Sequence, residues 1–209
     1  MSDHELLPIV ECGDPILRRR AEPVDPSTLH TVELHRLIER MRATMEAAPG
    51  VGLAAPQVGV PLQLAVLQDG PERWGHLTED ERADRERDAL PFLVLVNPTV
   101  SPVEDLGQVS FYEGCLSVPG ITGVVARHRA VRVNALDEHA RPVDRVFVGW
   151  AARIVQHEVD HLGGQLYLDR VETRSLSTVD NYAQRWAAHP LSQASAELGF
   201  MLRQSPAPG

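Results

Sequence analysis

Residues 157–161 read His-Glu-Val-Asp-His, and this run constrains the fold and the chemistry of the chain more than any other. Positions four apart lie on one face of an α-helix, so a helix here would present His157 and His161 together. Two such imidazoles can bind one metal ion, and Glu158 can then reach a water molecule beside it. The pattern indicates metal-assisted hydrolysis. A helix that buries both histidines as hydrogen-bonded core residues is the alternative.

A third protein ligand is needed if such a metal is to keep one position open for water. The chain has two cysteines, Cys12 and Cys115. Cys115 lies in Glu113-Gly-Cys-Leu-Ser117, directly after a strand-like run, and a thiolate there would complete a Cys-His-His site. As an alternative, Cys115 is a small buried apolar residue, which is how free cysteine usually behaves.

A further segment, Gly50-Val-Gly-Leu-Ala-Ala-Pro-Gln57, combines glycines with a single amide side chain. Glycine allows another backbone to approach closely. The amide N–H of Gln57 can stabilise an oxyanion. An ordinary turn that enters a strand would account for the same residues without a catalytic role.

Together these segments resemble the peptide deformylase family. The resemblance lies in three motifs that follow in the family's order: Gly-apolar-Gly-apolar-Ala-Ala-x-Gln at 50–57, Glu-Gly-Cys-apolar-Ser at 113–117 and Gln-His-Glu-x-Asp-His at 156–161. It runs from about residue 8 to about residue 170. Three motifs in one order are far more specific than any one of them.

The resemblance implies an α+β fold in which antiparallel sheets pack around the helix that carries the H-E-x-x-H motif. It also implies hydrolysis of the formyl group from N-formylmethionine at the start of new bacterial proteins, with release of formate. Cys115, His157 and His161 would hold one divalent metal ion. The family is known for ferrous iron, with zinc, nickel or cobalt as substitutes.

The same resemblance, read with general chemistry, gives the catalytic roles. Glu158 takes a proton from the attacking water and returns it to the departing amine. The Gln57 amide and the backbone N–H of Leu116 stabilise the oxyanion.

Three charged residues are candidates for the shell around the metal ligands. Asp160 would orient a ligand or pair with Arg153, which lies seven residues earlier on the same helical face. Glu113 would form hydrogen bonds that hold the Gly50–Leu53 loop or the Cys115 loop. A plain structural salt bridge is the alternative for each of them.

The methionine side chain needs an apolar pocket, for which Val51, Phe111 and Ile154 are candidates because they lie beside the three motifs. The peptide backbone is expected to pair with strand-like edges at Val51–Gly52 and Tyr112–Gly114, as in strand addition. Ordinary core packing would account for the same apolar residues.

Composition narrows the class of protein. The chain has 209 residues, of which 43% are hydrophobic and 23% charged, with a formal net charge of −9. This balance argues against a specific nucleic-acid surface or an anionic-membrane surface. The acidic N-terminus lacks the layout of a signal peptide, and no apolar run approaches the ~20 residues that span a bilayer. We therefore expect a cytoplasmic protein without a membrane partner.

Residues 1–175 are expected to form one catalytic domain, and residues 176–209 a C-terminal helix and tail that pack on it or trail from it. Periodicity predicts an N-terminal helix over 25–48, capped by Asp25 or Ser27, and a C-terminal helix around 179–188. The metal-binding helix is predicted over 150–162. Short strands are predicted at 62–67, 92–96, 108–112, 131–136 and 143–148.

A charged segment lies between residues 69 and 90, where nine of the ten residues from Glu79 to Asp88 are charged. We expect a solvated surface insertion there, with a partner-binding role as the alternative. The tail from Ser205 to Gly209 is expected to be disordered. The resemblance implies the ribosome near its exit tunnel as a macromolecular partner.

Three other functions are compatible with parts of the same sequence. A zinc endopeptidase uses the same helix motif but takes a downstream His or Glu as third ligand, and His189 is the one histidine after His161. A non-catalytic homologue that binds peptide or metal would usually lack Glu158, Cys115 or Gln57, and all three are present. A deformylase-like enzyme for a specialised formylated substrate is the remaining alternative.

Overall fold

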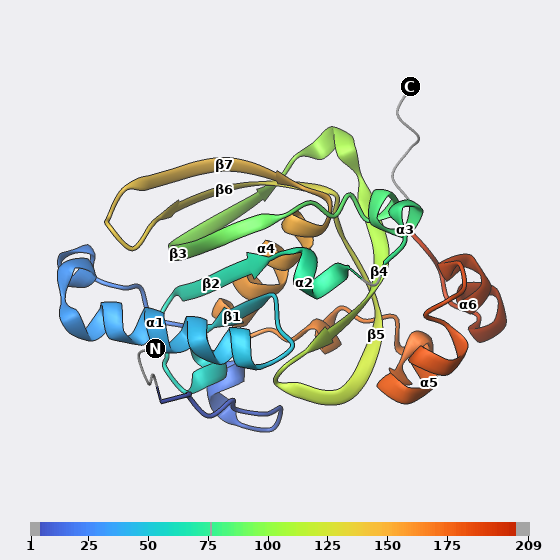
Figure 1. Ribbon diagram of the computed structural model, residues 1–209, viewed down its shortest axis with the longest axis horizontal. Coiled ribbons are helices and arrows are strands. Elements are labelled where there is room, and N and C mark those ends of the chain that lie inside the picture. Colours follow the sequence, from blue (N-terminus) through green and yellow to red (C-terminus); the bar gives the residue numbers. More distant parts are fainter. Residues whose placement is uncertain (1–4, 76, 204–209) are drawn as a thin grey trace.

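The structure is a computed structural model that describes residues 5–75 and 77–203 of the chain (Figure 1). Its strands are β1 (Gly52–Ala54), β2 (Leu64–Asp69), β3 (Leu90–Pro102), β4 (Gln108–Cys115), β5 (Val118–His128), β6 (Ala130–Leu136), β7 (Pro142–Val148) and β8 (Ser177–Thr178). Its α-helices are α1 (Val32–Ala47), α2 (Pro71–Trp74), α3 (Glu79–Asp84), α4 (Gly149–Leu162), α5 (Val179–Arg185) and α6 (Leu191–Leu198). No described helix is long and apolar enough to cross a membrane.

The strands form two antiparallel sheets. One has five strands in the order β1-β2-β3-β6-β7, and the other has three in the order β4-β5-β8. Each strand pairs with its neighbour in the antiparallel sense. The expected α+β class with antiparallel sheets is confirmed.

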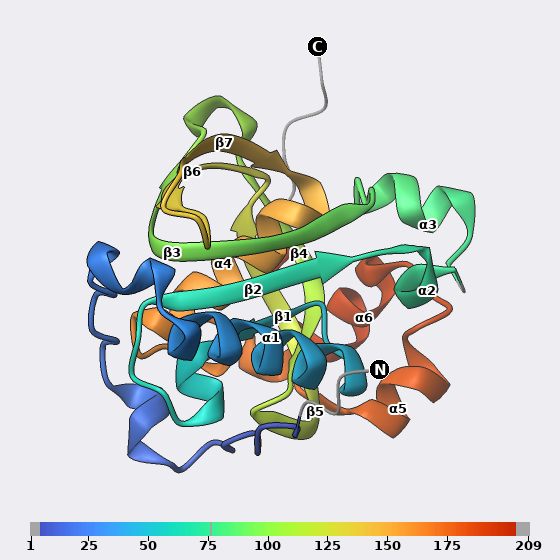
Figure 2. The same cartoon turned by 60° about the vertical axis from the view of Figure 1, so that its left-hand side comes forward.

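The five-stranded sheet is covered on both faces, by α1 on one side and α4 on the other (Figure 2). Successive residues of a strand point to opposite faces. Thus Leu64 and Val66 of β2 join the apolar cluster with α1, whereas Ala65 and Leu67 join the cluster with α4. Burial on both faces explains why β2 reads as a continuous apolar run. The helix that carries the H-E-x-x-H motif is thereby fixed against the sheet.

The N-terminal helix begins later than the sequence predicts. Residues Pro26–His30 form a separate 3-10 helix capped by Asp25, and α1 begins at Val32 with Thr31 as its cap. The Thr31 side chain accepts a hydrogen bond from the Leu34 N–H, and its extended backbone separates the two helices. Val32, the first residue of α1, is 67% exposed.

Strand β5 is absent from the predicted strands although it has eleven residues. Pro119, Gly120 and Gly123 give its first half the composition of a loop. The strand forms because it pairs with β4 in a continuous register from Gln108↔His128 to Gly114↔Thr122. This register places Arg127 of β5 near the middle of the site described below.

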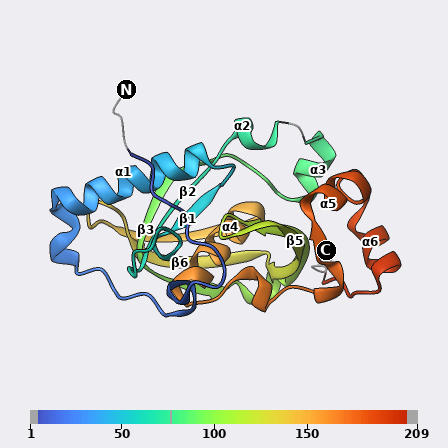
Figure 3. The same ribbon diagram turned by 90° about the horizontal axis from the view of Figure 1, so that it is seen from below.

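The helix predicted around 179–188 is present as α5, and a second short helix, α6, follows it that was not predicted. Helix α5 ends at Arg185, and Pro190 precedes α6. A residue before proline is disfavoured in helical conformation, so the helix cannot continue through His189. Both helices lie beside β5 at one end of the molecule (Figure 3), where Ala194 and Phe200 pack on Val124. The expectation of a disordered tail falls on residues outside those described.

Candidate metal centre

Three side chains that can bind a metal ion meet where α4 faces the end of β4. One ligand atom each from Cys115, His157 and His161 lies within 4.8 Å of the others. His157 and His161 lie one turn apart on α4, and Cys115 is the last residue of β4. The Sγ of Cys115 is 3.3 Å from Nε2 of His161. The structure therefore brings together the three ligands predicted from separate motifs.

The electrostatics differ between the two histidines, and they favour a cation at His157. Burial lowers the pKa of His157, but contacts with Cys115 and Glu113 outweigh it and raise the pKa well above its usual value. Negative groups at this position stabilise a positive charge, whether it is a proton or a metal ion. Burial, together with the charges of His157 and Arg127, holds the pKa of His161 well below its usual value. His161 is thus neutral, as a metal ligand must be.

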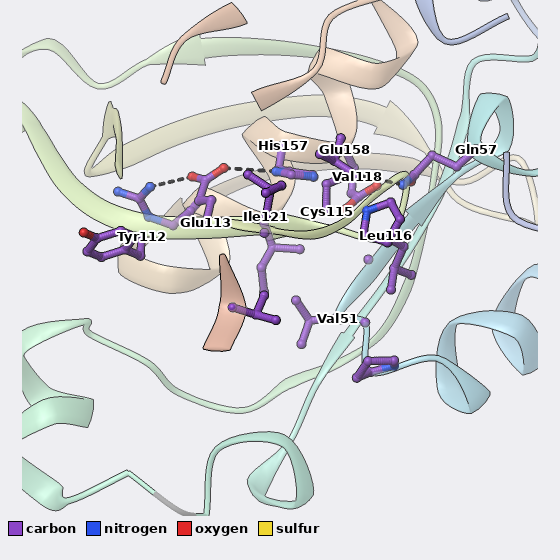
Figure 4. A pocket seen from close by; sticks show the side chains of 18 of the residues that line it. Val51, Gln57, Tyr112, Glu113, Cys115, Leu116, Val118, Ile121, His157 and Glu158 are labelled. Atoms are coloured by element: carbon purple, nitrogen blue, oxygen red, sulfur yellow. Dashed lines mark hydrogen bonds and ion pairs between the residues drawn. The ribbon is translucent and has the colours of Figure 1, made fainter. Parts of the chain in front are cut away.

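Glu158 lies beside these residues as a buried carboxylate (Figure 4). Among the described residues its Oε2 has no hydrogen-bond partner, and burial raises its pKa to about 7. Gly52 makes room for it, since a Cβ at Gly52 would lie 2.3 Å from Oε1 of Glu158. A buried carboxylate oxygen without a partner, next to a Cys-His-His set, fits a divalent metal with a water molecule better than it fits a satisfied core.

The side-chain amide of Gln57 is held with its N–H directed toward Cys115 and Ser117. Its Oε1 accepts a hydrogen bond from the Ala54 N–H at 2.8 Å, which fixes the orientation of the amide. Its Nε2 is then 3.5 Å from Sγ of Cys115 and 3.3 Å from Oγ of Ser117. Leu116, the other predicted oxyanion donor, lies in the turn after Cys115 and lines the adjoining cavity.

Glu113 links the metal ligands to a buried arginine pair. Oε2 of Glu113 is 3.0 Å from Nδ1 of His157, so the carboxylate orients this imidazole. Arg127 donates to both oxygens of Glu113 at 2.6 and 2.9 Å, and Arg153 donates to Oε1. Burial would raise the pKa of Glu113, but these two arginine charges hold it well below its ordinary value.

A pair between Arg153 and Asp160, one of the two alternatives for Asp160, is not found. Arg153 pairs with Glu113 and not with Asp160, which instead accepts from Arg127 at 2.7 Å and from Arg170 at 3.0 Å. Arg153 and Asp160 are seven residues apart, which separates them by about 10.5 Å along α4. Glu113 of β4 and Arg127 of β5 lie between them and pair with them instead. Glu113 was expected to hold the Gly50–Leu53 loop or the Cys115 loop, and its side chain instead bonds to His157 and the two arginines.

Replacing Glu113 by glutamine is expected to weaken metal binding by about 10–100-fold, the usual effect of losing an outer partner of a ligating histidine. Competition with a chelator measures this affinity. Asp144→Asn is the matched control, because it removes a carboxylate from an exposed pair with Arg132. Equal metal affinities in the Glu113 variant and the wild type, with both folded, would contradict the assigned contact.

A cavity of about 630 Å³ adjoins the site. Its lining includes residues expected to contact substrate: Val51, Gly52, Tyr112, Gly114 and Ile154. Phe111 is not among the lining residues, so its assignment as a direct pocket residue is wrong. Phe111 and Tyr112 are successive residues of β4, so their side chains point to opposite faces of the strand. The Phe111 ring packs against Trp150 in a T-shaped arrangement, with 5.9 Å between ring centroids.

The cavity wall also contains residues that were not predicted, among them Arg87, Ile121, Trp150 and Val179. Trp150 lies two helical turns before His157 and therefore on the same face of α4, a spacing that could have identified it. No sequence signal marks Arg87 within its charged run. Val179 belongs to α5, which reaches the cavity only through the packing of the C-terminal helices.

Two sheet edges border the cavity. Strand β1 ends one sheet and β4 ends the other, and residues of both line the cavity. An edge strand presents backbone groups to which an extended peptide can add. Part of the β4 edge is already used, because the Ser110 N–H donates to the Arg203 carbonyl at 2.9 Å.

Comparison with known proteins agrees with this geometry. The family model described as polypeptide deformylase matches residues 6–176. The chain is 53% identical over 196 residues to peptide deformylase 1 of Streptomyces coelicolor, across 94% of this chain and 87% of that protein. It is 40% identical over 171 residues to the mitochondrial peptide deformylase of Homo sapiens, across 82% of this chain and 70% of that protein.

The fold is similar to that of solved structures. The Met-Ala-Ser-bound class I type b peptide deformylase from Acinetobacter baumannii superposes with a TM-score of 0.70 at 34% identity. The match covers 80% of this chain and 99% of that one.

Proposed function

The chain belongs to the polypeptide deformylase family and is a hydrolase that removes the N-terminal formyl group from new polypeptides; we propose that it does so with a metal ion held by Cys115, His157 and His161 and with Glu158 as the general base. The single observation that supports this most strongly is the convergence of the three ligand atoms within 4.8 Å beside a buried carboxylate.

Each residue around the site has its own role in the proposed reaction. Glu158 takes the proton of the attacking water on its unpartnered Oε2 and later gives it to the departing amine. Gln57 donates from Nε2, and Leu116 from its backbone N–H, to the oxygen that gains charge. When bound, a divalent metal supplies Lewis-acid polarisation of the formyl group and lowers the pKa of water. Glu113 holds the ring of His157 throughout.

We place the methionine side chain in the 630 Å³ cavity, against Val51 and Ile154. The peptide backbone then adds to the free edges at Val51–Gly52 and Tyr112–Gly114. Main-chain pairing of this kind makes few demands on the residues that follow methionine. The general pool of formylmethionyl chains therefore fits the site better than one specialised formylated product.

The proposal also covers the native metal, the catalytic part of the chain and the cellular location. A thiolate beside two imidazoles suits ferrous iron as well as zinc, nickel or cobalt, and we propose ferrous iron as the native metal. We assign catalysis to residues 1–175 and treat residues 176–209 as an accessory C-terminal segment. Because the substrate is a nascent chain, we propose a cytoplasmic enzyme that acts near the exit tunnel of the ribosome.

Formate release from formyl-Met-Ala-Ser, by protein purified without oxygen, tests the function. Release of formate without cleavage of an internal peptide bond is the expected result. Cleavage of unformylated peptides at internal bonds would instead indicate an endopeptidase. Binding of the formylated peptide without turnover by fully metallated protein would indicate a non-catalytic homologue.

Gln57→Ala is expected to reduce kcat by about 10²–10³-fold, because one preorganised oxyanion donor is typically worth about 3–4 kcal/mol of barrier. The reduction should appear in kcat with little change in KM, since the donor acts mainly on the transition state. Steady-state kinetics separate the two parameters. Gln193→Ala, on α6 away from the site, is the matched control. A change confined to KM would contradict the assigned role of Gln57.

A further inference from the structure

The last residues of the charged insertion return to the start of the metal-binding helix. The Trp150 N–H donates to the Glu86 carbonyl at 3.4 Å, and Glu86 forms a two-point ion pair with Arg129 at 2.7 and 2.8 Å. Gly149, at φ +61°, has no space for a side chain, since a Cβ there would lie 2.4 Å from Cβ of Glu86. This end of the insertion is thus fixed on α4, whereas α3 within it has no buried residue.

Arg87 is the residue through which the insertion reaches the cavity. Its Nε and Nη2 donate to the two carboxylate oxygens of Asp69 at 2.8 and 3.1 Å. Only 10% of the Arg87 side chain and 1% of the Asp69 side chain are exposed. Asp69 ends β2, so the pair joins the two ends of the insertion. Desolvation offsets most of what such a buried pair adds to stability, so its place in the cavity wall points to positioning.

The Arg87 side chain also contacts the Trp150 ring, and the Arg87 N–H donates to the Arg82 carbonyl at 3.0 Å. The Arg87 guanidinium carbon lies 4.9 Å from the ring centroid, that of Arg153 lies 5.7 Å from it, and the Phe111 ring packs on it in a T-shaped arrangement. The indole Nε1 is buried and has no hydrogen-bond partner among the described residues. This cavity-lining ring is therefore held by the apolar cluster beneath it, by the Phe111 ring and by two cations, one of which belongs to the insertion.

We propose that Arg87 is a positioning residue that fixes the Trp150 wall of the methionine pocket, so that the insertion determines which side chains the enzyme accepts. This inference rests on the proposed function, because it takes the cavity as the pocket for the substrate's first side chain. A fixed indole wall accepts the flexible, unbranched side chain of methionine and excludes a rigid ring such as phenylalanine. Loosening that wall should weaken the exclusion.

The test is the ratio of kcat/KM for formyl-Met-Ala-Ser to that for formyl-Phe-Ala-Ser. A ratio within one sample does not depend on the fraction of folded protein. Arg87→Met should lower it on the order of tenfold, the size of one buried cation–π contact, mainly by raising kcat/KM for the phenylalanine substrate. Arg87→Lys should lower it similarly, because lysine keeps a charge for Asp69 but lacks the planar group that stacks. Arg82→Met, the same change elsewhere in the insertion, should leave it unchanged.

A double-mutant cycle then asks whether the effect passes through the indole. In a Trp150→Leu background, Arg87→Met should change the ratio less than twofold, because coupled residues are not additive. Wild-type ratios in both Arg87 variants, or an undiminished effect in the Trp150→Leu background, would overturn the inference alone. Wild-type protein that releases no formate from either substrate would overturn the proposed function, and this inference with it.

Discussion

Replacing Glu158 by glutamine is expected to reduce kcat for formyl-Met-Ala-Ser by about a thousandfold, within the 10²–10⁴-fold range for loss of a general acid–base group. Glutamine matches the shape of glutamate, so the fit against Gly52 is preserved. It cannot accept the proton of the attacking water. Because Glu158 is not one of the three metal ligands, metal content should remain at the wild-type level while turnover falls.

Formate release and metal content, measured on the same sample, check this expectation. Glu39→Gln is the matched control, since Glu39 is exposed on α1 and far along the chain from the motifs. It should retain wild-type turnover. Glu158→Gln protein with full metal content and a kcat within tenfold of the wild type would remove Glu158 from the role of base.

Replacing His161 by alanine is expected to abolish activity by a different route, through loss of the metal. Its imidazole is 1% exposed and supplies one of three ligand atoms. Metal affinity should fall by more than the 10–100-fold that is typical when only an outer partner of a ligand is lost. Metal content after dialysis, followed by formate release, measures both consequences.

His189→Ala is the control that separates this site from an endopeptidase site. His189 is the downstream histidine that an endopeptidase would need as third ligand, and it is exposed in the loop before α6. The variant should keep its metal and its turnover. Loss of metal in His189→Ala, with retention in Cys115→Ala, would contradict the Cys-His-His assignment.

The Cys-His-His group proposed to hold the metal could be predicted from sequence because each of its residues is fixed by local structure. His157 and His161 are related by one helical turn, and the Glu113–Ser117 motif carries Cys115 at the end of a strand. Gln57 follows from its own motif, since its amide is oriented by Ala54, three residues earlier. For these residues, spacing along the chain is enough to determine position.

Contacts between distant segments could not be predicted in the same way. The partner of Arg153 depends on the register of β4 against β5, and β5 itself is hidden by Pro119, Gly120 and Gly123. Arg153 and Asp160 share a helical face, yet each finds its partner on a neighbouring element. Strand alternation similarly turns Phe111 away from the cavity that Tyr112 lines.

The outer wall of the cavity depends on still longer-range packing. Arg87 lies within a run of mixed charge that reads as solvated surface, and it reaches the cavity only because Asp69 and Trp150 hold it. Val179 reaches the same cavity through the folding of the C-terminal helices onto β5. The chemistry of the site is thus encoded locally, whereas its substrate pocket is assembled from segments far apart in sequence.

The most direct test of the central claim is a titration of metal-free protein with ferrous iron in the absence of oxygen, with formate release measured at each addition. If Cys115, His157 and His161 form the one catalytic centre, activity should rise in proportion to bound metal and reach its plateau at about one ion per chain. Full activity in metal-free protein, or one bound ion per chain without formate release, would contradict it.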